Sequence, residues 1–179
     1  LYWVLEIYGH TRVSLLDGGY PAWRAAGLPV DTGAVKFAPV NYLAAIRPEF
    51  LVTRLQMRLA IDNPEIAIVD ARGVEMYQGE DSIASRAGHI PTALSYPSTL
   101  NLTRREGIAY FKSVTELDEL YRDLDEYSRV FLYCDGGREC ESSVNYMALQ
   151  LLNKPVAIYD GGWYEWGNDP DLPIVSPEL

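Results

Sequence analysis

The sequence has little cysteine, little positive charge and no long hydrophobic run. Two cysteines in 179 residues, close together in one segment, do not form the spread framework of a disulfide-stapled protein. No stretch approaches the roughly 18 consecutive apolar residues of a transmembrane helix. Lysine and arginine number 15 against 25 aspartates and glutamates, and the net charge of −10 opposes binding to nucleic acid. We therefore expect neither a nucleic-acid partner nor a membrane partner.

The composition is that of a folded globular protein, with 48% hydrophobic and 22% charged residues. The length suits one well-buried domain with a few dozen residues left over. The chain opens at Leu1 without a methionine or a signal-peptide pattern, so we expect the start of the parent protein to lie upstream. A cytoplasmic location is expected because reactive thiols persist in reducing compartments, and a periplasmic one stays open because an export signal can lie upstream.

One sequence pattern occurs twice, near the two ends of the chain. Residues 16–23 (LDGGYPAW) resemble residues 159–166 (YDGGWYEW), and each copy follows an apolar run and precedes a Leu-Pro pair. The two copies are about one domain length apart. This distance indicates duplicated domains, because the repeats of solenoid proteins recur about every 20 to 50 residues. The alternative is that Asp-Gly-Gly is a turn signal used twice.

The repeat predicts three segments in the chain. Residues 1–30 are expected to be the end of a first domain, residues 31–39 a linker, and residues 40–179 a complete domain. The first segment is expected to pack against the complete domain or a neighbouring molecule, because its apolar side chains would otherwise form a large exposed patch. These side chains are Tyr2, Trp3, Leu5, Ile7 and Tyr8.

Between the two copies, short apolar runs alternate with helical patterns. Residues 67–70, 130–133 and 156–159 are predicted to be buried strands. Capping boxes at Thr53 and Ser113 predict two helix starts. The buried face of a further helix is predicted to contain Val144, Met147, Ala148, Leu151 and Leu152. This order indicates an α/β fold with a mainly parallel sheet covered by helices on both faces, whose ligand site lies beyond the carboxyl ends of the strands.

The segment CDGGRECESS, which begins at the end of one predicted strand, contains the candidate chemistry. Its loop comprises Cys134, Asp135, Gly136, Gly137, Arg138, Glu139 and Cys140. The two glycines permit positive φ, so successive N–H groups can face inward as an anion-binding nest beside the positive end of a helix. We expect this arrangement to stabilise the Cys134 thiolate and to lower its pKa below the ordinary value of about 8.5.

Three further motifs, together with this loop, resemble the rhodanese-like sulfurtransferases. They are VDAR at residues 69–72, GHIPTA at residues 88–93 and IYDGGWYEW at residues 158–166. Thr92 stands where the second family motif has glycine. The resemblance covers residues 40–175 as a full domain and residues 1–30 as the end of a preceding one. It implies a tandem-domain protein with the rhodanese-like α/β fold, whose mainly parallel sheet has five strands and helices on both faces.

By this resemblance the function is sulfur transfer through a persulfide on Cys134. The thiolate would take sulfane sulfur from thiosulfate, 3-mercaptopyruvate or a persulfide and pass it to a thiol, cyanide or a protein acceptor. No metal or organic cofactor is needed. The loop residues 134–140 would hold the persulfide, and Arg72, Arg86 and Trp163 are candidate substrate contacts.

Several residues depart from the relatives that use thiosulfate. Those relatives have cations just after the cysteine, where this chain has Asp135, and Met76 aligns with a substrate-binding arginine. A preference for thiosulfate is therefore not expected, although Arg138 inside the loop and Arg86 outside it are candidate replacements. The acidic residues Asp135, Glu139 and Glu141 predict a smaller lowering of the Cys134 pKa than in those relatives.

Other interpretations of these residues stay open. Cys134 is either the nucleophile or a buried structural cysteine, and Cys140 either packs or attacks an oxidised Cys134 to form a disulfide. His89 either stabilises its own turn or acts as a base. Asp70 and Arg72 either touch substrate or form a structural ion pair.

Two other functions are compatible with this architecture. Certain cysteine phosphatases share it, but they need an arginine six residues after the cysteine, where this chain has Cys140; Arg138 stands two residues short. The second alternative is a binding or regulatory module that has lost efficient turnover, which the acidic loop and Met76 favour.

Overall fold

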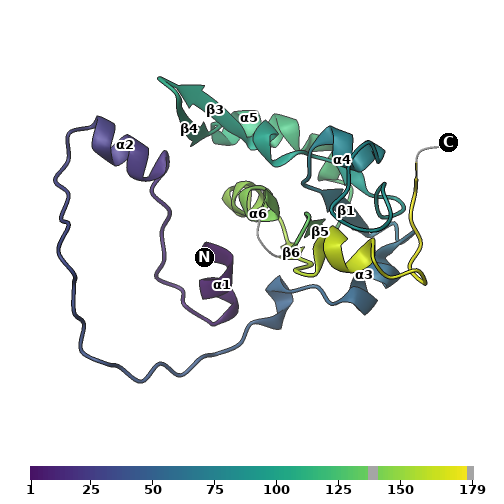
Figure 1. Ribbon diagram of the computed structural model, residues 1–179, viewed down its shortest axis with the longest axis horizontal. Helices are drawn as coiled ribbons and strands as arrows, with labels where there is room; N and C mark the ends of the chain where they lie inside the picture. Colours follow the sequence, from purple (N-terminus) through teal and green to yellow (C-terminus); the bar gives the residue numbers. More distant parts are fainter. Residues whose placement is uncertain (137–140, 177–179) are drawn as a thin grey trace.

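The computed structural model describes residues 1–136 and 141–176. Its centre is a parallel sheet of four strands in the order β2-β1-β5-β6 (Figure 1). The strands are β1 (Ile66–Asp70), β2 (Leu94–Ser95), β5 (Arg129–Tyr133) and β6 (Val156–Ile158). The three predicted strands are confirmed. A parallel bridge joins Leu51 to Ile158, and the five strands implied by the resemblance are reached only when this bridge is counted.

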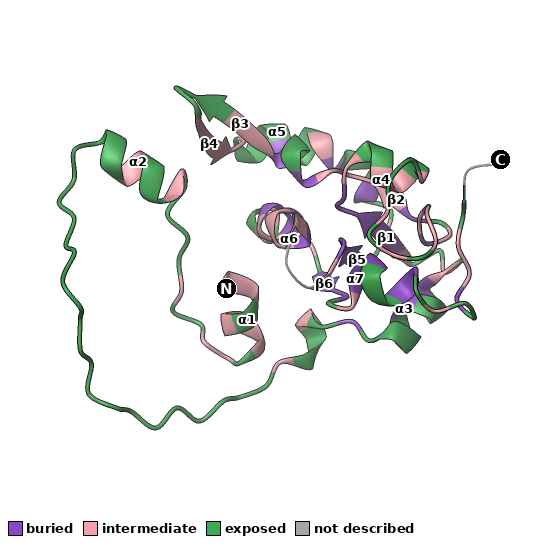
Figure 2. Ribbon diagram, in the orientation of Figure 1, coloured by how far each residue is buried: buried purple, intermediate pink, exposed green. Residues whose placement is uncertain are grey.

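Helices cover both faces of the sheet, because side chains along each strand alternate between two hydrophobic clusters. Ile68 and Phe131 belong to one cluster, whereas Val69 and Leu132 belong to the other. Helices α3 (Arg54–Ala60) and α7 (Gly162–Trp166) contribute to the first, and α5 (Val114–Leu120) and α6 (Glu141–Leu151) to the second. Figure 2 shows the burial concentrated in the strands and in the inner faces of these helices. The predicted α/β layers are therefore confirmed.

Both predicted capping boxes are present. The Thr53 hydroxyl accepts a hydrogen bond from the Gln56 N–H, and the Gln56 side chain accepts one from the Thr53 N–H; Ser113 and Glu116 form the same reciprocal pair. Each box satisfies backbone donors that a helix start leaves unpaired, so α3 and α5 begin where the sequence places them.

The predicted buried face of α6 is only partly correct. The buried residues are Ser142, Asn145, Tyr146, Ala148 and Leu149. Polar members of this face are tolerated because they find partners: the Asn145 amide donates to the Tyr96 carbonyl oxygen, and the Tyr146 hydroxyl donates to Glu6. Val144 and Met147, which were expected in the core, instead line a cavity shared with the N-terminal segment.

The N-terminal segment packs against the rest of the chain. Helix α1 (Tyr2–Ile7) places Tyr2 and Trp3 against the cluster that contains α5 and α6. The Trp3 indole N–H donates to the Phe50 carbonyl oxygen at 2.8 Å. The expected packing is thus confirmed for Tyr2 and Trp3, whereas Tyr8 stays 48% exposed.

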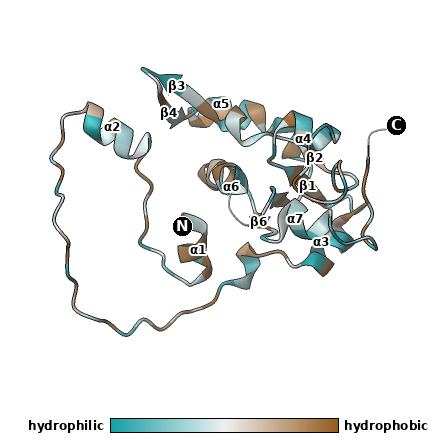
Figure 3. Ribbon diagram, viewed as in Figure 1, coloured by the Kyte–Doolittle hydropathy of each residue, from teal (hydrophilic) through white to brown (hydrophobic). Residues whose placement is uncertain are grey.

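Residues 28–47 contain no helix or strand and form a long arc away from the sheet (Figure 1). Every residue from 31 to 46 is exposed, although apolar side chains recur along the arc (Figures 2 and 3). The predicted linker, residues 31–39, lies inside this arc. The division into a first domain, a linker and a complete domain remains a prediction.

The two copies of the repeat share the backbone geometry of one glycine. In the first copy, Gly19 begins helix α2 (Gly19–Ala25) with φ of 56°. In the second, Gly162 begins α7 with φ of 54°. The positive φ favours glycine at both positions. The copies differ before the helix. The φ of the preceding glycine is 75° at Gly18 and −60° at Gly161, and β6 precedes the second copy whereas helix α1 precedes the first.

The antiparallel hairpin formed by β3 (Leu102–Arg105) and β4 (Ile108–Phe111) has no counterpart among the sequence predictions. Its turn residues, Glu106 and Gly107, both have positive φ, as two-residue hairpin turns require. The remaining short elements are α4 (Val74–Gln78) and three 3-10 helices, η1 (Pro48–Phe50), η2 (Ser98–Asn101) and η3 (Arg122–Leu124). Within the described ranges, no helix is both long enough and apolar enough to span a bilayer.

Candidate active site

Cys134 follows β5 directly, at the carboxyl edge of the sheet, and is 5% exposed. The first turn of α7 holds the backbone of Cys134 and of the residue that follows it. The Trp163 N–H donates to the Cys134 carbonyl oxygen at 2.8 Å, and the Tyr164 N–H donates to the Asp135 carbonyl oxygen at 2.9 Å. Helix α7, which follows the last strand, therefore positions Cys134 and Asp135, the first two residues of the cysteine loop.

Two glycines permit this close approach of backbones. A Cβ atom on Gly136, whose φ is 83°, would lie 2.6 Å from the Gly161 carbonyl oxygen. A Cβ atom on Gly162 would lie 2.5 Å from the Cys134 carbonyl oxygen. Because real Cβ contacts are not that short, larger residues would force the loop and α7 apart.

The Cys134 sulfur lies among hydrogen-bonding groups. Its Sγ atom is 3.3 Å from the Ser142 hydroxyl oxygen, and Ser142 is only 3% exposed. The N–H groups of Ser142 and Gly136 also bond to the thiolate and act to lower its pKa. Part of the predicted inward-facing nest is therefore present, built by the amides on the two sides of the loop.

The predicted lowering of the Cys134 pKa is nevertheless wrong. Burial raises the pKa of the thiol above its usual value, because desolvation penalises the charged form more than the hydrogen bonds favour it. The Glu141 carboxylate raises the pKa further, which confirms the expected opposition from this acidic residue.

Replacing Ser142 with alanine is expected to slow alkylation of Cys134 at fixed neutral pH by about ten- to a hundredfold, since a hydrogen bond to a charged group contributes about 1.5–3 kcal/mol. The pH profile of the rate should move to higher pH, because the variant loses a donor that stabilises the thiolate. Peptide-resolved measurement of iodoacetamide labelling against pH tests this. Ser142→Thr should restore the wild-type profile, and Ser128→Ala, far from the site, should not move it. An unshifted profile in Ser142→Ala would remove the assigned role.

Asp70 and Arg72 form a buried ion pair on the interior side of the cysteine loop. Both side chains are 0% exposed. Asp70 accepts hydrogen bonds from Arg72 Nε at 2.9 Å and Nη2 at 2.6 Å, and from the Tyr133 hydroxyl at 2.6 Å. Arg72 Nη2 also donates to the Gly88 carbonyl oxygen at 2.8 Å. The pair thus ties the end of β1 to the end of β5 and to the turn before residue 89.

The Arg72 guanidinium also faces Asp135 of the cysteine loop from the protein interior. Its Nη1 atom lies 3.8 Å from Oδ1 of Asp135, which is 4% exposed. Asp135 is therefore directed into the protein, where Arg72 partly neutralises its charge. An acidic residue directly after the cysteine is compatible with this site because a buried cation lies beneath it.

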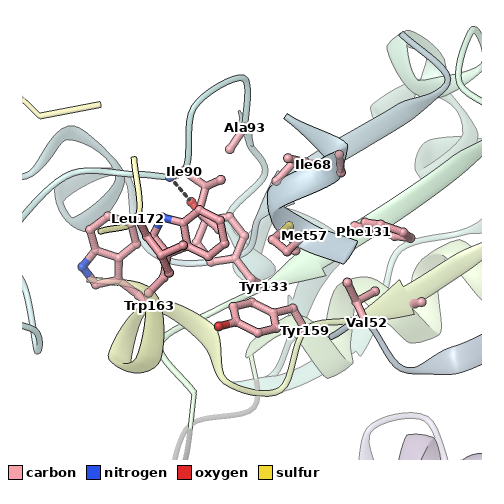
Figure 4. Packing of buried hydrophobic residues seen from close by; sticks show 13 residues of the cluster. Val52, Met57, Ile68, Ile90, Ala93, Phe131, Tyr133, Tyr159, Trp163 and Leu172 are labelled. Atoms are coloured by element: carbon pink, nitrogen blue, oxygen red, sulfur yellow. Dashed lines mark hydrogen bonds between the residues drawn. The ribbon is translucent and has the colours of Figure 1, made fainter. Parts of the chain in front are cut away.

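Arg86 and Trp163 lie next to each other, and the Trp163 indole N–H donates to the Arg86 carbonyl oxygen. The Arg86 guanidinium donates to the carbonyl oxygens of Gly167, Leu172 and Trp166 at 2.9–3.1 Å. Trp163 is 0% exposed, and the Arg72 guanidinium lies 4.5 Å from its ring centroid. Figure 4 shows Trp163 within the hydrophobic cluster beside Tyr133, whose hydroxyl accepts the Ile90 N–H.

His89 and Met76 lie in the segment that follows β1. The His89 ring stacks on Tyr77 with 3.8 Å between centroids, and its Nδ1 atom is 2.7 Å from the Tyr77 carbonyl oxygen. The His89 backbone also pairs with Val175. These contacts are those expected of a histidine that stabilises its own turn. Met76 is half-buried in α4.

Cys134 lines a cavity of about 110 Å³. Its described walls include Trp3 and Val4 of α1, Ser142 of α6, and Tyr159 and Asp160 after β6. The described lining residues include no lysine or arginine. Arg72, Arg86 and Trp163 are not among them. The role of Arg72, Arg86 and Trp163 as substrate contacts remains a prediction.

Sequence reasoning missed several residues of this cavity. Ser142 carries a weak signal, because it follows the loop at the start of a helix. Trp3 and Val4 carry none, since no local pattern relates them to the cysteine. Gly137, Arg138, Glu139 and Cys140 lie outside the described residues, so the predictions made for them, including the Cys140 disulfide, stay predictions.

Comparison with known proteins identifies the family. The sequence pattern of the rhodanese-like domain matches residues 53–169, which is more than half of the chain. The chain belongs to the rhodanese-like family. This rhodanese-like chain is 34% identical over 179 residues to 3-mercaptopyruvate sulfurtransferase of Escherichia coli, covering 97% of the chain and 62% of that relative. It is 31% identical to a putative thiosulfate sulfurtransferase of Mycobacterium tuberculosis, covering 97% and 61%.

The rhodanese-like chain therefore spans about three fifths of these curated relatives. Its fold is also found in solved structures. An anaerobic ergothioneine biosynthesis enzyme from Chlorobium limicola superposes with a TM-score of 0.84 over 99% of the chain and 44% of that enzyme, at 24% identity. This likeness confirms the rhodanese-like fold.

Proposed function

We propose that this chain is a sulfurtransferase that carries sulfur as a persulfide on Cys134. The observation on which the proposal depends is the position of the Cys134 sulfur, at the carboxyl edge of the sheet, within reach of the Ser142 hydroxyl and two backbone N–H groups. These donors suit a thiolate or a persulfide anion. The names of the relatives, which are 3-mercaptopyruvate and thiosulfate sulfurtransferases, support the same activity.

The reaction consists of two substitutions at sulfur. In the first, the Cys134 thiolate attacks the outer sulfur of the donor, a new Sγ–S bond forms, and the bond between that sulfur and the rest of the donor breaks with its electron pair on the leaving group. In the second, an acceptor thiolate or cyanide attacks the outer sulfur of the persulfide. The Sγ–S bond breaks and its electron pair returns to Cys134, so no external oxidant or reductant is consumed.

The cavity favours a small donor. Its volume of about 110 Å³ corresponds to roughly three or four water molecules. Thiosulfate and 3-mercaptopyruvate are of this order of size, and the acceptor is a thiol, cyanide or a protein thiol.

We further propose that residues 1–30 are the end of a first rhodanese-like domain. The similar φ angles at Gly19 and Gly162 support this proposal. We also propose that the protein acts in the cytoplasm.

The proposal is tested by incubating the protein with thiosulfate, 3-mercaptopyruvate or glutathione persulfide and measuring its intact mass. One added sulfur atom, located on Cys134 by peptide mapping and released by a thiol acceptor, is expected with at least one donor. If no donor adds sulfur, the activity is wrong.

A binding or regulatory module is the second candidate function. The observation that favours it is the raised pKa of Cys134, because a protonated thiol is a poor nucleophile. The two candidates differ in the mass experiment: the module takes up no sulfur at any pH, whereas the enzyme takes up sulfur faster as the pH rises toward the thiol pKa.

A further inference from the structure

Helix α1 supplies part of the wall around the reactive sulfur. Trp3 and Val4 line the same cavity as Cys134, together with groups from α6 and from the end of β6. Helix α1 lies outside residues 53–169, the segment that matches the rhodanese-like domain. The family pattern therefore assigns no role to this wall.

Contacts with three parts of the domain hold α1 in place. The Trp3 indole donates to the Phe50 carbonyl oxygen at 2.8 Å, and Glu6 accepts the Tyr146 hydroxyl at 2.8 Å. The Arg47 N–H donates to the Ile7 carbonyl oxygen at 2.8 Å at the end of the helix. Because these bonds reach η1, α6 and the segment before η1, the wall is part of the folded structure.

A larger cavity lies next to the cavity at the cysteine, and Trp3 lines both. The second cavity, of about 390 Å³, lies between the N-terminal segment, the β3–β4 hairpin and α6. Among the described residues, Leu1, Trp3 and Ser143 line both cavities, and Trp3 has the largest side chain of the three. Most of the larger cavity is apolar, with Leu102, Phe111 and Met147 among its walls. An indole at this boundary limits how much space a molecule bound at Cys134 can occupy.

We propose that Trp3 is a specificity-determining residue, which restricts Cys134 to small sulfur donors by separating its cavity from the neighbouring apolar one. For the donors, this inference rests on the proposed function. The restriction is steric, however, and applies equally to any reagent that must reach the sulfur. Replacing the indole with a methyl group joins the two cavities and admits larger, more apolar molecules.

The test compares Trp3→Ala with the wild-type chain in labelling and in sulfur transfer. The rate of Cys134 labelling by a bulky reagent, fluorescein maleimide, relative to iodoacetamide is expected to rise about tenfold, the order expected when a pocket accepts a larger group. Peptide-resolved mass spectrometry distinguishes Cys134 from Cys140. The ratio of kcat/KM for glutathione persulfide to that for thiosulfate should rise by a similar factor.

Trp23→Ala is the matched control. Trp23 is a half-buried tryptophan of α2 whose indole donates to the Pro29 carbonyl oxygen, and it does not line the cysteine cavity. Its labelling ratio should equal that of the wild type. If Trp3→Ala does not fold by circular dichroism, Trp3→Leu, which keeps apolar packing with a smaller volume, decides the question.

An unchanged labelling ratio in the folded Trp3 variant, or an equal change in Trp23→Ala, overturns the proposal. The labelling result stands even if no donor adds sulfur to the wild type. In that case the sulfurtransferase activity is wrong, whereas the steric role of Trp3 is still supported or refuted by the two alkylating reagents.

Discussion

Replacing Cys134 with serine is expected to abolish sulfur loading and to reduce transfer on the order of 10⁴-fold or more, the loss seen when a catalytic nucleophile is removed. A serine hydroxyl keeps nearly the same size and can still hydrogen-bond to Ser142, but it does not ionise at accessible pH. It therefore cannot form the bond to the incoming sulfur. Intact mass after incubation with the donor, and the rate of sulfur release to a thiol, measure the loss.

The Cys134→Ser variant needs a control for folding. The two side chains occupy similar space, so the free energy of unfolding should stay within about 1 kcal/mol of the wild type. Ser128→Ala, a change at an exposed hydroxyl that bonds to the Glu65 carbonyl oxygen, should keep full activity. If folded Cys134→Ser still acquired and released one sulfur atom, another group would be the sulfur carrier.

Replacing Arg72 with methionine is expected to lower the free energy of unfolding by about 3–5 kcal/mol, the usual cost of removing one partner of a buried ion pair. The Asp70 side chain, which is 0% exposed, would lose its three guanidinium hydrogen bonds and its only cationic partner among the described ion pairs. The variant also loses the contact with the Trp163 ring and the bond to the Gly88 carbonyl oxygen. Urea unfolding followed by circular dichroism gives the difference.

Arg54→Met is the matched control for that experiment. Arg54 pairs with Asp169 at 3.0 Å, but its side chain is 51% exposed, and exposed pairs contribute about 0–1 kcal/mol. The double variant Arg72→Met with Asp70→Asn should recover part of the loss, because it removes the unpaired charge. Equal losses in Arg72→Met and Arg54→Met would mean that the buried pair does not stabilise the fold as described.

The local parts of this fold were predictable because their signals are local. A capping box needs only two residues three positions apart, so the starts of α3 and α5 follow from Thr53 and Ser113 with their partners. A buried parallel strand needs a short apolar run between turn residues, so β1, β5 and β6 were found. The hairpin β3–β4 was missed, since each of its strands has only four residues and little alternation.

The position of Cys134 at a strand end followed from the order of these elements, but its protonation did not. The two glycines and the helix start indicated an anion-stabilising loop, and amides from both sides of it do bond to the sulfur. The direction of the pKa shift depends instead on how much solvent the whole fold removes from the thiol. A sequence pattern contains no measure of that burial.

The sequence by itself determined the α/β class, the strand that carries the cysteine and the family to which the chain belongs, because periodicity, caps and motifs are properties of neighbouring residues. Only the tertiary structure decided that Arg72 faces Asp135, that Arg86 binds backbone carbonyl oxygens and that Trp3 lines the cavity at Cys134. These contacts join residues far apart in the chain, and side-chain packing, burial and backbone approach select them only once the whole domain has folded.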